Sequence, residues 1–507
     1  MALLEVITTN FLDLKMFLLV AVIFFISLIW FNRDKRYLPP GPIGLPIIGN
    51  LPYFILCKKE APEAFGNLAK RNGPIIYVRF GAMEAIVLND FKTIQEAMNH
   101  PDLQDRPEQK TFESKKIKDA VGGKAEGIAM ASGKAWKHQR KFLVNTFRDF
   151  GVGKSRFEDS VAMEAAAMMA AIREKNNLPF DPQILFSNAF SNIICSVTFG
   201  KRFEYYDPKF ERLLALVLRQ FEVIGGAAVL AAFPILGKFE FGPIKEVTKN
   251  TLEFINFFQN IINDHKSKFD ENNINDVIDA YMLEMRSSEV NGSPDPEVFN
   301  EKNLGALVGD LFFAGIDSSV SSLRWALVYF LINPEVQVKV QTELDDVIGR
   351  DRMPRWEDRS RLPYVEATIA EIQRIGTVAA IGGTHAARKD VTFRGYTIPK
   401  GIAVIPNVYA VMRNPVLWPK PLEFKPERFL DENGKFTKPE HFIPFNIGPR
   451  KCPGEQLAKM ELFIFLTHLL HKFTFYQPED TPAPSTDGKM GLTFKPPPFQ
   501  VSLRERD

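Results

Sequence analysis

Residues 444–454 read PFNIGPRKCPG, and residues 455–470 continue as EQLAKMELFIFLTHLL. The first segment is rich in Gly and Pro, which predicts a loop. The second segment predicts a helix that begins near Gly454 or Glu455. Apolar residues at helical spacing mark this helix as a core element: Leu457, Met460, Phe463, Ile464 and Leu470. Cys452 therefore lies at the junction between a loop and a buried helix.

The position of Cys452 favours the thiolate form of its side chain. The positive end of the helix dipole and the cations Arg450 and Lys451 all stabilise a negative sulfur. The other two cysteines, Cys57 and Cys195, are far away in the sequence, which excludes a disulfide framework and a multi-thiolate metal site. Two interpretations stay open for Cys452 from its position alone: a buried structural cysteine, or one axial bond to a haem iron.

The composition of the whole chain is that of an ordinary globular protein. The 507 residues carry 63 Lys+Arg against 61 Asp+Glu, a net charge of +2, and 24% of all residues are charged. This composition excludes extensive disorder and argues against a polybasic nucleic-acid-binding protein, so we expect no nucleic-acid partner. The 44 Phe residues indicate a large aromatic core that includes an apolar cavity.

The sequence pattern predicts a mainly α protein with a minor β part. Strand patterns occur at 75–88, at 391–405 and near the C-terminus at 473–476 with 499–503, while helical periodicity dominates elsewhere. No βαβ repetition and no G-x-G-x-x-G after a strand is found, which argues against a Rossmann domain. Because no repeat or linker interrupts them, residues 51–507 are expected to form a single large domain.

The N-terminal region differs from the rest of the chain. Residues 16–31 (MFLLVAVIFFISLIWF) form an uncharged apolar run, and three basic residues follow at 33–36. The positive-inside rule predicts a single-pass membrane anchor with its basic stop over residues 1–36, and the rest of the chain on the cytosolic side. A cleaved signal peptide is the alternative. Residues 37–50 are rich in Pro and Gly and predict a stiff hinge.

A longer pattern surrounds the cysteine. The pattern F-x-x-G-x-R-x-C-x-G is matched by Phe445, Gly448, Arg450, Cys452 and Gly454. It resembles the haem-binding loop of the cytochrome P450 family. The resemblance implies a cytochrome P450-like haem-thiolate fold with haem b as cofactor. It also implies that Cys452 is the axial thiolate to the iron, that Arg450 pairs with a haem propionate, and that the glycines let the backbone approach the ring.

Further stretches resemble motifs of the same family and follow its order. Glu371 and Arg374 match its E-x-x-R, and Arg428 in PERF (426–429) matches the partner of that pair. The implied role of these three residues is a structural charge network that locks the chain beneath the haem pocket. Without the resemblance, the Glu371 and Arg374 pair would be an ordinary surface ion pair.

Three residues resemble the family's propionate contacts. Trp136 and Arg140 match its W-x-x-x-R, and His385 in GGTHAARKD occupies a position where family members place a propionate-binding His or Arg. The alternatives are an exposed basic helix for the first two and a hydrogen-bonded loop histidine for the third.

A single long helix is expected over residues 300–333. Its middle, AGIDSS at 314–319, is unfavourable in a helix because Gly, Asp and Ser weaken helical structure. Either packing tolerates a kink there, or the segment widens a groove. The segment resembles the family's [AG]-G-x-[DE]-T-[TS], with Ser318 in place of the usual Thr. The resemblance implies that Asp317 and Ser318 are catalytic and deliver protons to dioxygen.

The resemblance is strongest to animal enzymes of the microsomal type. It implies insertion of one oxygen atom of O2 into a lipophilic substrate: a steroid, fatty acid, terpenoid or xenobiotic. No flavin or nicotinamide domain is visible, so NADPH-cytochrome P450 reductase is the implied electron donor, with cytochrome b5 as a second candidate. The implied location is the endoplasmic reticulum membrane. Two other classes stay open: a haem-thiolate isomerase or dehydratase that acts without NADPH, and a non-catalytic haem-binding sensor.

Two residue sets complete the expectations. Apolar residues near these motifs are candidates for the substrate pocket, although each could equally belong to the core: Phe312, Phe313, Ala314, Ala380, Ile381, Leu492 and Phe494. Basic residues near the Trp136 and Cys452 motifs could form a docking face for an acidic partner, and scattered solvated charge is the alternative: Lys134, Lys137, Arg140, Lys141, Arg450, Lys451 and Lys459.

Overall fold

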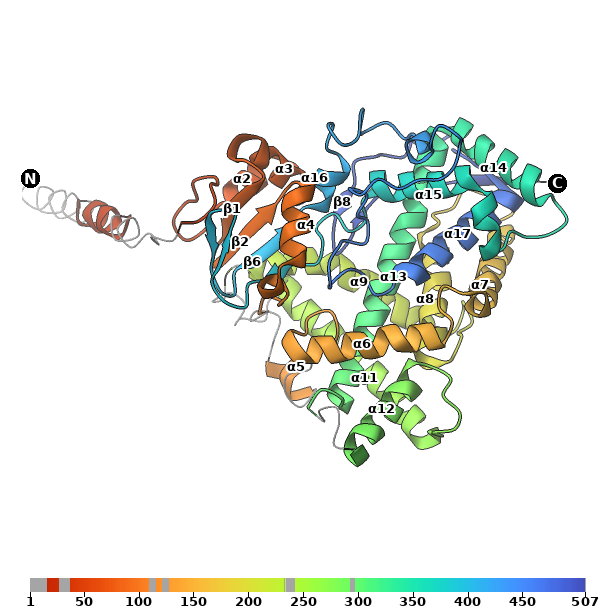
Figure 1. The fold of residues 1–507 in the computed structure, drawn as a ribbon, viewed down its shortest axis with the longest axis horizontal. Helices are drawn as coiled ribbons and strands as arrows, with labels where there is room; N and C mark the ends of the chain where they lie inside the picture. Colours follow the sequence, from red (N-terminus) through yellow and green to blue (C-terminus); the bar gives the residue numbers. More distant parts are fainter. Residues whose placement is uncertain are drawn as a thin grey trace, which may run out of the picture.

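The computed structural model describes residues 16–26, 37–108, 115–120, 127–231, 233, 242–291 and 297–506. Its helices are α2 (Leu51–Leu56), α3 (Ala61–Asn72), α4 (Phe91–Asn99), α5 (Lys115–Ala120), α6 (Gly133–Asp149), α7 (Ser155–Arg173), α8 (Gln183–Phe199), α9 (Pro208–Ala231), α11 (Gly242–Lys268), α12 (Val277–Asn291), α13 (Glu301–Ile332), α14 (Pro334–Ile348), α15 (Pro363–Gly376), α16 (Val408–Met412) and α17 (Glu455–Lys472). The fold is mainly α, as expected (Figure 1).

The strands are short and form small sheets. They are β1 (Ile75–Phe80), β2 (Met83–Leu88), β3 (His385–Ala386), β4 (Val391–Phe393), β5 (Tyr396–Ile398), β6 (Ala403–Pro406), β7 (Phe473–Tyr476), β8 (Lys489–Met490), β9 (Phe494–Lys495) and β10 (Ser502–Glu505). The largest sheet has the order β1-β2-β6-β3, with β1 and β2 antiparallel and β2 parallel to β6. β7 pairs with β10, so the expected C-terminal strand begins a few residues later than the pattern at 499–503 indicated.

Helix α13 passes through the middle of the helical body (Figure 1). Its 32 residues span about 48 Å at 1.5 Å per residue. Asn300 caps its N-terminus, because the side chain accepts a hydrogen bond from the Asn303 N–H. α13 packs against α8, α11, α15 and α17, and most of its residues are buried. This central helix carries the polar segment 314–319 into the interior of the protein.

The polar segment does not interrupt α13, which is helical throughout. The glycine within it has a packing role. A Cβ at Gly315 would overlap the side chain of Ile194 on α8, so a larger residue would push the two helices apart. Gly315 is therefore required where α8 crosses α13, and the helix tolerates its weak propensity because the packing compensates.

The N-terminal residues lie at one end of the molecule (Figure 1). Residues 16–26 form a helix, while the basic residues at 33–36 lie outside the described residues. Residues 37–50 pack along β1: the Tyr77 N–H donates to the Pro40 carbonyl, and the Asn50 N–H donates to the Arg79 carbonyl. Among the described residues, α13 is the helix long and apolar enough to cross a membrane, but half of its most apolar window is buried in the core.

Candidate functional site

The loop around Cys452 is a tight turn that leads into α17. The Cys452 N–H donates to the Phe445 carbonyl at 3.0 Å, and Gly454 is the N-cap of α17. Gly448 has φ +80°, and a Cβ there would overlap the Met98 carbonyl. A glycine is required at this position for both reasons. The loop therefore holds the sulfur immediately before the N-terminus of a buried helix.

Burial controls the ionisation of Cys452. It raises the pKa of the thiol above its usual value, although the Gly454 N–H, Arg140 and Lys451 lower it in part. The helix end and nearby cations favour the thiolate, as expected, but the desolvation of the sulfur outweighs them. A cation bound directly to the sulfur would reverse this balance.

A cluster of basic residues surrounds the loop. The guanidinium of Arg450 lies 4.1 Å from the centroid of the Trp136 ring and donates to the Ala131 carbonyl at 2.7 Å. Arg140 donates to the Lys451 carbonyl at 2.7 Å. Figure 1 shows that α6, which carries Trp136 and Arg140, runs across the face of the helical body. The structure thus brings residues from α6 and from the cysteine loop together.

Two more basic side chains belong to this cluster. The Nδ1 atom of His385 lies 2.7 Å from the Leu103 carbonyl, and Arg106 donates to the Thr384 carbonyl at 2.6 Å. Sequence reasoning missed Arg106, because its Asp-Arg-Pro context matches none of the motifs that singled out the other residues. Arg106 links the segment before α5 to the segment before β3, so it connects parts of the chain that are far apart in the sequence.

The basic cluster has an excess of positive charge. Burial and the repulsion of Arg106 lower the pKa of Arg450 to about 9 and that of His385 to about 3. Burial and Arg140 lower the pKa of Arg106 to about 10. Nε and Nη1 of Arg450 and Nε2 of His385 are buried without a hydrogen-bond partner among the described residues. The two unpartnered N–H groups of Arg450 fit an anionic group that accepts several hydrogen bonds.

The polar segment of α13 carries the Ser318 hydroxyl and the Asp317 carboxyl, which have different partners. Ser318 donates to the Ala314 carbonyl at 2.7 Å, while Asp317 accepts a 2.6 Å hydrogen bond from Thr493. Asp317 is buried, and this burial raises its pKa despite Lys495, Thr493 and Arg324. No hydrogen bond joins Asp317 to Ser318 in the described part of the chain. The expected pair is therefore adjacent in sequence but has separate partners.

Another carboxyl contacts the same segment from α17. Glu461 is buried and accepts a 2.7 Å hydrogen bond from Ser319, and its second oxygen has no partner among the described residues. Burial raises the pKa of Glu461 to about 8. Sequence reasoning missed Glu461 and Thr493, because both lie in apolar stretches that read as ordinary core.

The three charged residues Glu371, Arg374 and Arg428 lie together as the sequence pattern indicates. Arg374 makes two hydrogen bonds to the Glu371 carboxylate, at 2.6 and 2.8 Å, and Arg428 lies 3.4 Å from it. Glu371 and Arg374 are fully buried. Arg374 also donates to the Met412 and Pro421 carbonyls. This network ties α15 to the irregular chain that follows α16.

The family model described as Cytochrome P450 matches residues 39–503. The chain belongs to the cytochrome P450 family. It is 37% identical to human Cytochrome P450 2U1 over 504 residues, covering 94% of this chain and 91% of the relative. It is 38% identical to human Cytochrome P450 2J2, covering 92% and 90%, and 37% identical to Cytochrome P450 18a1 of Drosophila melanogaster, covering 94% and 88%.

This P450 is an oxidoreductase, a haem-iron monooxygenase, and its cofactor is haem b. Haem b carries two propionates, and the basic cluster fits them: Arg450 offers buried N–H groups without a partner, and Arg106 and Arg140 add positive charge beside it. Asp105, the nearest acid to Arg450, is already paired with Arg388 at 3.1 Å.

The substrate-pocket candidates divide into two groups in the structure. Ala314 is exposed, and Phe313, Ile381 and Leu492 are at least partly exposed. The remaining three are buried in the core: Phe312 packs against Phe199 and Phe258, Phe494 stacks on Trp325, and Ala380 is fully buried. For these three, the structure favours the alternative of ordinary core residues.

The expected docking face is smaller than the sequence indicated. Lys137 and Lys141 are exposed on α6. Arg450 is buried under Trp136, while Lys451 and Lys459 both pair with Glu455. The exposed positive charge of this face therefore comes mainly from α6.

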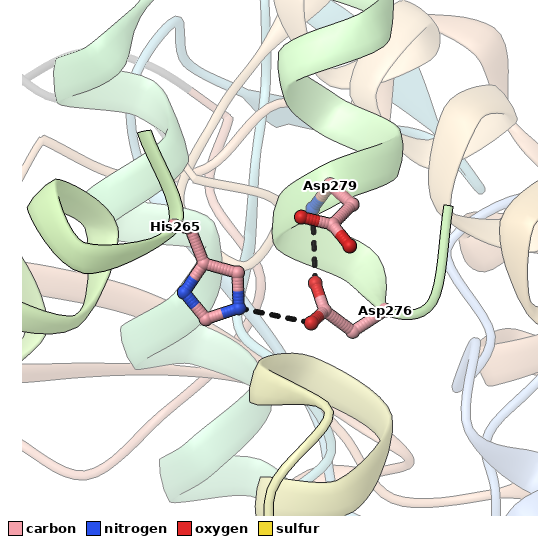
Figure 2. A group of neighbouring side chains, drawn as sticks. All are labelled: His265, Asp276 and Asp279. Atoms are coloured by element: carbon pink, nitrogen blue, oxygen red, sulfur yellow. Dashed lines mark hydrogen bonds and ion pairs between the residues drawn. The ribbon is translucent and has the colours of Figure 1, made fainter. Parts of the chain in front are cut away.

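One other group of described side chains has metal-ligand character: His265 on α11, and Asp276 and Asp279 at the start of α12 (Figure 2). Nε2 of His265 lies 2.9 Å from Asp276, and Nδ1 lies 2.9 Å from the Ile261 carbonyl. Burial alone would lower the pKa of His265, but these two hydrogen bonds raise it to about 9. Both ring nitrogens face acceptors, so the imidazole is protonated. It therefore forms an ion pair with Asp276 and does not bind a metal.

Proposed function

We propose that this P450 inserts one oxygen atom of O2 into a lipophilic substrate, using electrons from NADPH-cytochrome P450 reductase. The observation that carries this proposal is the cluster of basic side chains beside the Cys452 loop, in which Arg450 has two buried nitrogens without a partner among the described residues. Such a cluster is unfavourable in a protein unless an anionic group compensates it.

In this proposal Cys452 would supply the thiolate that holds the haem iron. Arg106, Arg140, Arg450 and His385 hold the propionates, and the Trp136 ring packs against the Arg450 guanidinium. The tight backbone at Phe445, Gly448 and Gly454 brings the chain close to the ring. When bound, haem supplies dioxygen binding and oxygen transfer, which no amino-acid side chain provides.

The residues of α13 supply protons and shape in this proposal. The Ser318 hydroxyl and the Asp317 carboxyl are the catalytic proton donors to dioxygen. Ser318 is partly exposed and delivers the proton, whereas Asp317 is buried and stores it. The exposed Ala314 leaves room beside them.

The substrate is proposed to be a steroid, fatty acid, terpenoid or xenobiotic. Ala314, Phe313, Ile381 and Leu492 are the accessible apolar candidates, and they lie on three separate parts of the chain. Apolar walls with few polar groups favour a lipophilic molecule.

The proposed partner reductase binds the exposed face of α6, where Lys137 and Lys141 offer positive charge to an acidic surface. Cytochrome b5 is a second candidate for the same face. The proposed location is the endoplasmic reticulum membrane, with residues 1–36 as anchor and basic stop, residues 37–50 as hinge, and residues 51–507 as the cytosolic catalytic domain. The exposed apolar helix at 16–26 supports the anchor.

The carbon monoxide adduct of the reduced protein tests the ligand. We expect a spectrum of thiolate ligation that is lost in Cys452→Ala and kept in Cys195→Ala, a matched control because Cys195 is buried elsewhere. A spectrum of histidine ligation in the unaltered protein contradicts the role of Cys452.

A binding screen against a lipid library, followed by product identification with reductase, NADPH and O2, tests the reaction. We expect consumption of NADPH and O2 together with an oxygenated product. Product formed without NADPH would instead indicate an isomerase or dehydratase, and binding without turnover would indicate a sensor.

A further inference from the structure

Asp317 is one of the residues around a small hollow between α8, α9, α13 and β9. Polar lining comes from Gln183 and Ser187 of α8, from Ser321 and Arg324 of α13 and from Lys495 of β9. Apolar side chains of α9 and α13 close the rest of it. The hollow has room for a water molecule, and its polar lining offers several hydrogen-bond partners to one.

Two hydroxyls connect with Asp317 at this hollow. Thr493, in the turn between β8 and β9, donates to Oδ2 of Asp317 at 2.6 Å. The Thr493 hydroxyl also lies 3.2 Å from the Ser321 hydroxyl. All three side chains are buried. The chain Ser321–Thr493–Asp317 therefore runs from the hollow wall to the carboxyl without a gap.

The direction of these hydrogen bonds depends on the charge of Asp317. An ionised carboxylate only accepts, so the single Thr493 proton points to Asp317 and Ser321 must donate to Thr493. A protonated Asp317 can instead donate to Thr493, which then donates to Ser321. The two directions differ by one proton on Asp317. These hydrogen bonds can therefore reverse their direction when Asp317 gains or loses a proton, as a proton relay requires.

Charged groups near Asp317 and the burial of its side chain act in opposite directions on its ionisation. Lys495 and Arg324 favour the ionised carboxylate, while burial opposes it. Arg324 is itself buried, its Nε atom has no partner among the described residues, and Asp181 and Asp317 are the acids that favour its charge. A buried, unpartnered cationic donor on the wall of a hollow indicates that the hollow is hydrated.

We propose that Thr493 and Ser321 are positioning residues that recharge Asp317 with protons from this hydrated hollow. After Asp317 has given up its proton, Thr493 transfers its hydroxyl proton to Oδ2 and takes the proton of Ser321. Ser321 then takes a proton from a hydronium ion that enters the hollow from solvent, which leaves neutral water there. Each step breaks one O–H bond and forms one, and the net result is one proton moved from the hollow to Asp317. The inference rests on the proposed catalytic role of Asp317.

The test uses Thr493→Val, which keeps the shape of the side chain and removes the hydroxyl. In the reconstituted holoenzyme we expect the peroxide released per NADPH to rise about tenfold, less than the 10²–10⁴-fold that a general acid contributes, because Asp317 itself remains. Thr493→Ser is expected to restore coupling to within about twofold, because the hydroxyl is restored. Thr467→Val is the control: it removes an equally buried hydroxyl, which on α17 bonds only to backbone carbonyls.

A second readout does not depend on turnover. The infrared carbonyl band of protonated Asp317, identified by its loss in Asp317→Asn, is expected to shift in Thr493→Val and to titrate at higher pH, because the Thr493 hydrogen bond favours the ionised form. A purely structural role for Thr493 would not move this band. Ser321→Ala is expected to uncouple in the same direction and serves as the second variant if Thr493→Val fails to fold.

The outcomes separate the inference from the proposed function. If Asp317→Asn uncouples the enzyme while Thr493→Val and Ser321→Ala behave like Thr467→Val, the relay is wrong and the role of Asp317 stands. If Asp317→Asn leaves coupling and its pH profile unchanged, the proposed role of Asp317 and the relay both fail.

Discussion

At the residue scale, Ser318 is the position where this chain departs from its family's motif. Its hydroxyl donates to the Ala314 carbonyl one turn earlier, at 2.7 Å. A threonine would make the same bond with its methyl group fixing the rotamer, whereas the serine side chain rotates more freely. The proton donor is thus present but less rigidly held.

The proposed role of Ser318 predicts an uncoupled variant. Ser318→Ala is expected to fold and to bind haem, but to lose about tenfold more of its NADPH electrons as peroxide, because the hydroxyl donor is gone. Ser318→Thr is expected to couple at least as well as the parent. Measuring peroxide and product per NADPH checks both, and unchanged coupling in Ser318→Ala would contradict the role.

Glu461 predicts a pH-dependent stability. Its pKa is raised from 4.5 to about 8 by burial, so the folded state binds the proton more tightly than the unfolded state. The contribution is complete below pH 4.5 and is lost as the pH rises through 8, by roughly 4 to 5 kcal/mol in all. Glu461→Gln is expected to flatten this fall in urea-unfolding curves. The exposed Glu432→Gln is the control and should follow the parent.

Individual residues differ in how well the sequence predicts them. Cys452, Arg450 and the glycines of the loop occur at fixed spacing in one stretch, so a local pattern is sufficient to find them. Arg106 and Thr493 reach the site only because distant segments fold together, and no local pattern records that contact. The neighbours of Arg106 indicated only a loop, and Leu492 and Phe494 beside Thr493 were candidates for the substrate pocket, so neither stretch indicated the contact itself.

At the element scale, the network of Glu371, Arg374 and Arg428 joins α15 to the 3-10 helix at Pro426–Phe429. Arg428→Ala is expected to lower the free energy of unfolding by about 3 kcal/mol, because it leaves a buried carboxylate with one cation instead of two. Urea unfolding of the holoenzyme checks this value. Arg504→Ala, at an exposed position on β10, is the control, and an equal loss there would contradict the prediction.

The ion pair of His265 and Asp276 links the end of α11 to the start of α12 (Figure 2). The pKa of His265 is raised from 6.5 to about 9, so its stabilising contribution is complete below pH 6.5 and lost as the pH rises through 9. The expected loss is roughly 3 kcal/mol. Thermal unfolding of His265→Gln should lack this alkaline fall. Parallel curves for parent and variant would show that the pair contributes nothing.

The elements themselves follow from the sequence where the pattern is long. The helix expected over 300–333 is found at Glu301–Ile332, because a strong apolar period agrees with an N-terminal cap at Asn300. The sequence left a widened groove open as the reason for Gly315. The close approach of the Ile194 side chain on α8 is sufficient to explain why this residue is glycine. A sequence shows that a glycine is unusual, but not which neighbour requires it.

At the scale of the whole molecule, the charge on α6 predicts salt-dependent reduction. Lys137→Glu and Lys141→Glu are expected to slow electron transfer from the reductase several-fold at low ionic strength, and high salt should slow the parent as well, because exposed charges are screened within about 10 Å at 0.1 M. Stopped-flow reduction checks the rates. Lys435→Glu, on an exposed loop, is the control, and rates independent of salt would contradict docking by charge.

The basic cluster also has a consequence for how the protein is made. Its members come from residues 106, 140, 385 and 450, and the neighbouring thiol is at 452 of 507. A ribosome releases the chain from its N-terminus, so the earliest arginine emerges long before the last one exists. The complete cofactor site can therefore form only when synthesis is nearly finished. Until then its earlier arginines have no cofactor propionate to pair with.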